Sequence, residues 1–147
     1  MNFFGKLLRT NVPSAVLVVR FLVGGVFLLE GMKKFLFVEQ WGAGRFARIG
    51  IPSPQILGPF VGTVEIVCGL LLLAGLLTRI ASIFLIVDIS VATASTKIPI
   101  LLKSGFWPME AEARTDYSML MGLVFLLIVG AGTWSLDARL SSRSDHG

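Results

Sequence analysis

Two carboxylic acids, Glu65 and Asp88, interrupt stretches of the chain that are otherwise apolar. Glu65 lies within residues 56–77 and Asp88 within residues 80–96. A carboxylate at the depth of a bilayer is costly unless a counter-charge, a proton or water relieves it, so such residues are candidate functional sites. The chemistry that they could perform is proton transfer, or the binding of a polar group inside a membrane.

The composition indicates a polytopic membrane protein. Hydrophobic residues make up 54% of the 147 residues and charged residues 15%, and the mean hydropathy is +0.82. Soluble domains usually carry about 25% charged residues. Most of the basic residues behind the net charge of +4 flank apolar runs. We therefore expect the lipid bilayer as a partner and no nucleic acid.

The chain offers few ligands for a cofactor or a metal. Its one cysteine, Cys68, excludes an intramolecular disulfide, and its one histidine, His146, lies beside the C-terminus. Haem, iron–sulfur clusters and structural zinc sites need more Cys or His ligands than these. We expect no metal and no cofactor of the chain's own, and no catalytic residue can be named.

Four stretches are long and apolar enough to cross a bilayer, which takes about 20 residues. We predict one all-α domain over residues 1–147, a polytopic membrane protein built as a four-transmembrane-helix bundle. A tight hairpin would join the second and third helices, and the two longer connections would be interfacial loop segments on one face. Lys6 and Arg9 favour cytoplasmic termini, and Lys33 and Lys34 at the other end of the first helix favour the opposite orientation. The predicted helices cover residues 14–37, 56–77, 78–96 and 116–134.

Two stripes of glycine mark the first two helices. Small residues on one helical face let two backbones approach closely and leave room for polar side chains in the seam. We expect the stripes to face one another and Arg20 to pair with Glu65. The alternatives are that the glycines serve packing alone and that Arg20 extends to the headgroups. The stripes are Arg20, Gly24, Phe27, Gly31 and Lys34 on the first helix, and Gly58, Gly62, Glu65 and Gly69 on the second.

Glu65 and Asp88 should lie at a similar depth. With a rise of about 1.5 Å per residue from the hairpin at residues 77–78, Glu65 is roughly 18 Å and Asp88 roughly 15 Å below the same surface. Asp88 has no evident partner on its own helix. It could pair with a neighbouring helix or hold a proton, and this makes it the better candidate for a protonatable or ligand-facing group.

Two further polar groups lie near the predicted membrane surfaces. On the side of the long connections we expect a cluster of charged side chains at helix ends, which is either a solvated face or the mouth of a binding site. On the side of the termini, Asp137 could pair with Arg79 across the short hairpin. The expected cluster on the connection side is Glu30, Lys34, Lys97 and Asp116.

Five short motifs follow one another over residues 16–140. They are RFLVG at 20–24 with Phe27, Gly31 and Lys34, GIP at 50–52, EIVCG at 65–69, GLLTR at 75–79 and GAGTWSLD at 130–137. In these motifs and their order the sequence resembles the DoxX family of small bacterial membrane proteins. The resemblance implies a four-helix bundle in the bacterial inner membrane and a link to thiosulfate:quinone oxidoreduction or to redox-stress complexes. The positions that match recurring polar features of the family are Arg20, Lys34, Glu65, Arg79 and Asp137.

Three functional hypotheses remain open from the sequence. In the first, the chain is no enzyme on its own but a quinone-interacting or accessory subunit of an oxidoreductase complex, with electrons supplied by a protein partner. In the second it is a non-enzymatic membrane scaffold that packs against a protein partner or forms a homo-oligomer. In the third it is a small proton-coupled carrier, which would need oligomerisation and would use Glu65 and Asp88 near the midplane.

Overall fold

The computed structural model describes residues 3–8 and 13–144, and in these residues all regular secondary structure is helical. The all-α class predicted from the sequence is confirmed. Arg9 and His146, which entered the sequence analysis, lie outside the described residues, and so does the side chain of Lys6.

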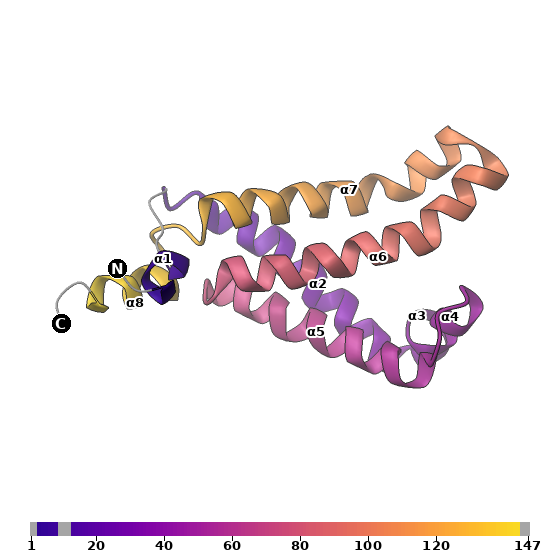
Figure 1. Ribbon diagram of the computed structural model, residues 1–147, viewed down its shortest axis with the longest axis horizontal. Coiled ribbons are helices and arrows are strands. Elements are labelled where there is room, and N and C mark those ends of the chain that lie inside the picture. Colours follow the sequence, from indigo (N-terminus) through magenta and orange to yellow (C-terminus); the bar gives the residue numbers. More distant parts are fainter. Residues whose placement is uncertain (1–2, 9–12, 145–147) are drawn as a thin grey trace.

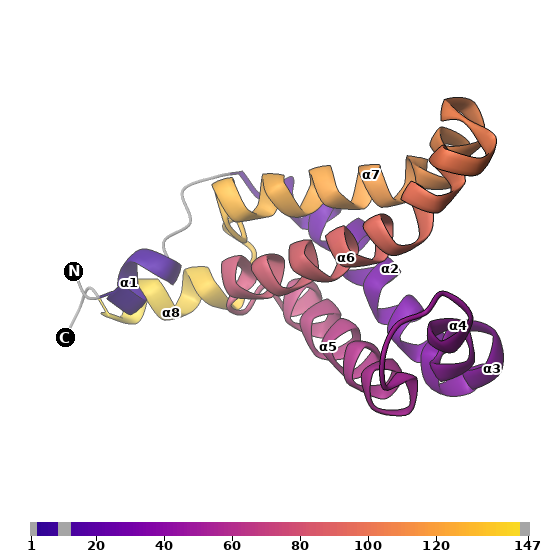
Figure 2. The ribbon, with the colours of Figure 1, turned by 45° about the vertical axis from the view of Figure 1, so that its right-hand side comes forward.

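Four long helices form the body of the molecule, and Figures 1 and 2 show them side by side. They are α2 (Val16–Leu36), α5 (Pro54–Ala74), α6 (Thr78–Ser104) and α7 (Phe106–Val129). The closest pairings are α2 with α5 and α6 with α7. By length and composition, α5 and α6 could each cross a membrane.

Short helices lie at both ends of this body. The helices α1 (Phe3–Leu8) and α8 (Leu136–Ser144) contact each other at the end that holds the termini. At the opposite end, α3 (Val38–Trp41) and α4 (Ala43–Arg48) fill the connection between α2 and α5. This connection was predicted as an interfacial loop segment, and the structure makes it helical.

Trp41 fixes the α3–α4 segment to the end of α2. The ammonium of Lys33 lies 4.5 Å from the centroid of its indole ring, and the guanidinium of Arg45 lies 5.1 Å from it. A cation within about 6 Å of an aromatic face is attracted by the ring. Two cations on one indole therefore hold the first connection against the body.

The prediction of an interfacial loop over residues 97–115 is wrong. The chain stays helical on both sides of Gly105, which has a φ of +87° and reverses the direction. Lys97 on α6 pairs with Asp116 on α7, and the run from Met109 to Arg114 consists of strong helix formers. The end of α7 also differs from the prediction, because glycines with positive φ at 130 and 132 stop the helix at Val129.

The glycine stripes of α2 and α5 face one another, as predicted. A Cβ placed on Gly24 would lie 2.9 Å from the carbonyl oxygen of Gly69, and one on Gly31 would lie 2.7 Å from that of Gly62. Real Cβ atoms do not approach carbonyl oxygens so closely. The two helices therefore pack backbone against backbone from the Gly24–Gly69 contact to the Gly31–Gly62 contact. Gly58, which was predicted to belong to the same stripe, instead faces Ala43 of α4.

Alanine substitutions at two adjacent glycines of α2 test the close packing of α2 against α5. Gly24→Ala should lower the free energy of unfolding by about 1–3 kcal/mol, because the added methyl forces α2 away from α5. Gly25→Ala should be neutral or slightly stabilising, since nothing lies within 4 Å of a Cβ at Gly25. Unfolding of the detergent-solubilised protein by denaturant measures both. Equal effects of the two substitutions would contradict the packing described.

Candidate functional site

Arg20 is buried inside the bundle and is 1% exposed. Its guanidinium donates to four carbonyl oxygens: Leu72 (2.9 Å), Leu73 (2.7 Å), Ala131 (3.2 Å) and Trp134 (2.6 Å). Leu72 and Leu73 belong to the last turn of α5, whose carbonyls lack partners within the helix. Arg20 thus caps α5 and ties α2 to the segment that follows α7.

The predicted ion pair between Arg20 and Glu65 is wrong. The opposed glycines set an antiparallel register in which residue 73 lies across from Arg20 and residue 28 lies across from Glu65. The two charges are therefore about eight residues apart along the seam, or roughly 12 Å. The guanidinium instead donates two hydrogen bonds to backbone carbonyls of α5 and two to the carbonyls of Ala131 and Trp134.

Asp137 caps the other helix of the hairpin, α6, at its N-terminus. Its carboxylate accepts hydrogen bonds from the backbone N–H groups of Leu77 (2.7 Å) and Thr78 (3.1 Å), at the start of α6. Its own N–H donates to the carbonyl of Gly75 at 2.9 Å. Burial raises the pKa of this carboxyl, and the two N–H donors oppose the rise. Asp137 therefore caps a helix N-terminus, where a negative charge is favourable.

The predicted ion pair between Arg79 and Asp137 is not formed. A guanidinium nitrogen of Arg79 donates to the carbonyl of Ile128, at 3.1 Å, while the carboxylate of Asp137 is directed to the backbone. Both carboxylate oxygens of Asp137 instead accept hydrogen bonds from the backbone N–H groups at the start of α6, which have no partner within the helix.

Lys34, Glu65 and Asp88 form a second buried polar site, which we call the Lys34 cluster. The Lys34 ammonium lies 2.6 Å from the Glu65 carboxylate, and their side chains are 12% and 6% exposed. The Asp88 carboxyl lies close enough to Glu65 and to Lys34 for their charges to interact. Asp88, which had no evident partner in the sequence, thus belongs to the same site as Glu65.

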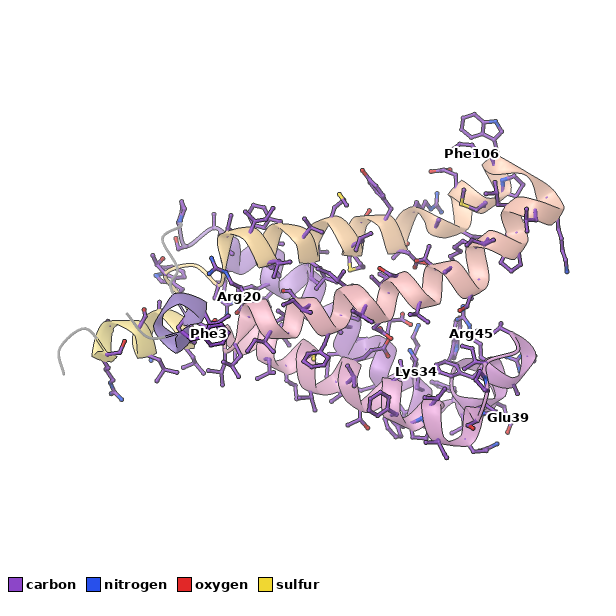
Figure 3. The ribbon with its side chains drawn as sticks, viewed as in Figure 1. Phe3, Arg20, Lys34, Glu39, Arg45 and Phe106 are labelled. Carbon is purple, nitrogen blue, oxygen red and sulfur yellow. The ribbon has the colours of Figure 1, made fainter. Side chains whose placement is uncertain are left out.

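The Lys34 cluster joins three helices. Lys34 comes from α2, Glu65 from α5 and Asp88 from α6, and Asp88 is only half-buried. Figure 3 places Lys34 toward the end of the body that holds α3 and α4, and Arg20 toward the end that holds the termini. The two polar sites of the bundle are therefore separate.

The charges of the Lys34 cluster do not balance. One ammonium faces two carboxyls, so the group carries a charge of −1 when both are ionised and is neutral when one holds a proton. Like charges in contact resist simultaneous ionisation. The arrangement can therefore take up and release one proton, and it presents ammonium donors to a polar ligand.

The four residues expected to cluster on the connection side are divided among three ion pairs. Glu30 pairs with Lys33 on the surface of α2 (2.6 Å), and Lys97 pairs with Asp116 at 3.5 Å, where Thr93 donates to the same carboxylate oxygen. Lys34 belongs to the cluster with Glu65 instead. Each of the four side chains is thus paired with a counter-charge, and the two alternatives for this group, a solvated face or the mouth of a binding site, stay open.

Substitutions in the Lys34 cluster should lower the free energy of unfolding by unequal amounts. Lys34→Met leaves two carboxyls without a cation and should lower the free energy of unfolding by about 3 kcal/mol or more. Glu65→Gln should cost less, because Asp88 remains to face the ammonium. Lys33→Met is the control, since it removes a half-exposed pair with Glu30 and a cation–π contact with Trp41, which together contribute at most about 2 kcal/mol. Denaturant unfolding measures all three, and a larger loss for Glu65→Gln than for Lys34→Met would refute the arrangement.

Comparison with known proteins agrees with the fold and the sequence motifs. The DoxX family model matches residues 15–98. "Uncharacterized membrane protein Rv3486" of Mycobacterium tuberculosis is 50% identical over 145 residues, which cover 95% of this chain and 89% of that protein. "Putative oxidoreductase CatD" of Bacillus subtilis is 28% identical over 121 residues, 82% of this chain and 83% of that protein. No solved structure gives a significant match. The chain is a membrane protein and belongs to the DoxX family.

Proposed function

We propose that this chain is a four-span protein of the bacterial cytoplasmic membrane, with both termini in the cytoplasm, and that it serves as a quinone-interacting subunit of a redox complex. The observation that carries the proposal is the Lys34 cluster, a charged and protonatable site inside an apolar bundle. The named role of the Bacillus subtilis relative as an oxidoreductase agrees with it.

The lengths of the helices support four spans. The two shorter helices, α2 and α5, have 21 residues each, about 32 Å, against a hydrocarbon core of about 30 Å. Two of the four charges on α2 are satisfied inside the bundle, because Arg20 binds carbonyls and Lys34 binds Glu65. The other two, Glu30 and Lys33, pair with each other on the surface near the end of α2. Large apolar side chains are exposed on all four helices, as expected for contact with lipid; examples are Phe21, Leu29, Phe60, Phe84, Val87, Phe125 and Ile128.

The donor set of the Lys34 cluster fits the headgroup of a quinone. An ammonium has three N–H donors, and Glu65 accepts from Lys34, so donors remain for a ring carbonyl. Asp88 is half-buried, which leaves the cluster open on the side of α6. The isoprenoid tail of a quinone would stay in lipid against the exposed apolar residues.

A bound quinone supplies two-electron redox chemistry, and its reduction to the quinol takes up two protons. In this proposal Lys34 orients the headgroup by donating to a carbonyl oxygen, and the Glu65–Asp88 pair holds one proton that it can pass on and regain from water. The chain has too few Cys and His residues for an electron carrier. The electrons would come from a partner subunit that carries a flavin or an iron–sulfur cluster.

Binding of a short-chain quinone to the protein in nanodiscs tests the proposal. Lys34→Gln should weaken binding about tenfold or more, the value of a charge-assisted hydrogen bond of about 1.5–3 kcal/mol. Lys33→Gln, one residue away on the outer face of α2, should bind as the wild type does. The proposal fails if the wild type binds no quinone, or if both lysine variants bind equally well.

A further inference from the structure

A hollow of about 290 Å³ lies at the end of the molecule that holds the termini, between the last turn of α5 and the start of α8. Its lining is Ala74, Thr133, Trp134, Ser135, Leu136 and Arg139. None of these side chains belongs to the Lys34 cluster, which lies toward the opposite end of the bundle. The hollow is therefore separate from the proposed quinone site, and the following inference rests only on the part of the proposed function that places the helices across the membrane.

The backbone around this hollow is held in place by buried contacts. The carbonyl of Trp134 accepts from the guanidinium of Arg20 at 2.6 Å. The hydroxyl of Ser135 donates to the carbonyl of Gly132 at 2.6 Å and accepts from the N–H of Ala138 at 3.1 Å. A ligand would therefore meet a preformed wall, which reduces the entropy lost on binding.

The charge of the hollow is positive. Arg139 is exposed, and no acidic side chain in residues 3–8 and 13–144 pairs with it. The nearest acid in sequence, Asp137, is 2% exposed and directs both carboxylate oxygens to the start of α6. An exposed guanidinium in a hollow that Thr133 also lines suits a phosphate group.

An apolar track leads from the hollow along α5. Ala74 lines the hollow, and Leu70 and Val67 precede it by four and seven residues, on the same helical face. Their side chains are 50% and 49% exposed. At the mouth, Trp134 is 69% exposed, as expected for an indole at the level of the headgroups. The ligand would thus be an amphiphile, with a polar head in the hollow and a chain along α5.

We propose that this hollow binds the headgroup of an anionic phospholipid, with the phosphate on Arg139 and one acyl chain along Val67 and Leu70. Its volume is at the low end of the range for small-molecule sites, about 300–1,000 Å³, which suits a headgroup whose tails remain outside. Arg20 and Asp137 hold this region to α5 and α6, so the bound lipid would stabilise the terminal end of the bundle.

Lipid competition tests the site. The delipidated protein is placed in equal amounts of phosphatidylglycerol and phosphatidylcholine, and the retained lipids are measured by native mass spectrometry. The wild type should retain phosphatidylglycerol about fivefold in excess, the effect of about 1 kcal/mol per basic residue near a charged surface. Arg139→Gln should remove most of this preference, and Arg114→Gln, an exposed arginine on α7, should keep it.

Two further experiments distinguish lipid binding in the hollow from nonspecific electrostatic attraction of anionic lipid to the protein. Ala74→Trp, which fills the hollow without altering charge, should also lower retention of phosphatidylglycerol, and unchanged helical circular dichroism shows that the variants are folded. Soluble glycerol 3-phosphate at the same concentration should not displace the lipid. Wild-type preference in both Arg139→Gln and Ala74→Trp, equal loss in Arg114→Gln, or full displacement by glycerol 3-phosphate would each overturn the proposal.

Discussion

The backbone contact between α2 and α5 is the constraint on which the rest of the structure depends. Because opposed glycines bring the two helices together, their register is fixed and every polar side chain on the seam has a defined neighbour. This register places Arg20 beside the last carbonyls of α5 and leaves Lys34 within reach of Glu65. The same packing therefore produces both the cap of a helix and the candidate site.

The two cations of the seam are satisfied in different ways, and the difference decides what each can do. The partners of Arg20 are neutral carbonyls with fixed positions, so this charge serves the architecture and has no proton to exchange with them. Lys34 is paired with the carboxyl of Glu65 and lies near that of Asp88, and the charge of a carboxyl changes with the binding of a proton. Chemistry in this protein is thus expected at the Lys34 cluster and stability at the Arg20 end.

The sequence was sufficient for the helical class, the glycine seam and the similar depths of Glu65 and Asp88, because each follows from spacing along one helix. The sequence was insufficient to predict which side chains on different helices interact with one another. Lys34 could have been chosen for Glu65, since the register of the glycines puts it about six residues away, nearer than Arg20. The capping by Asp137 could not have been found, because it requires the path of the chain after α7. The helical turn around Gly105 was missed because hydropathy does not distinguish a solvated helix from a loop.

The bonds of Arg20 also have a consequence for the order of synthesis. Arg20 lies in the first long helix, whereas two of its four acceptors, Ala131 and Trp134, follow the last one. A chain still on the ribosome has a guanidinium in α2 with only half of its final partners, and before α5 is made it has none of them. The hydrogen bonds of Arg20 are therefore completed only after the segment that follows α7 has been made, so the first long helix reaches its final state after the last one.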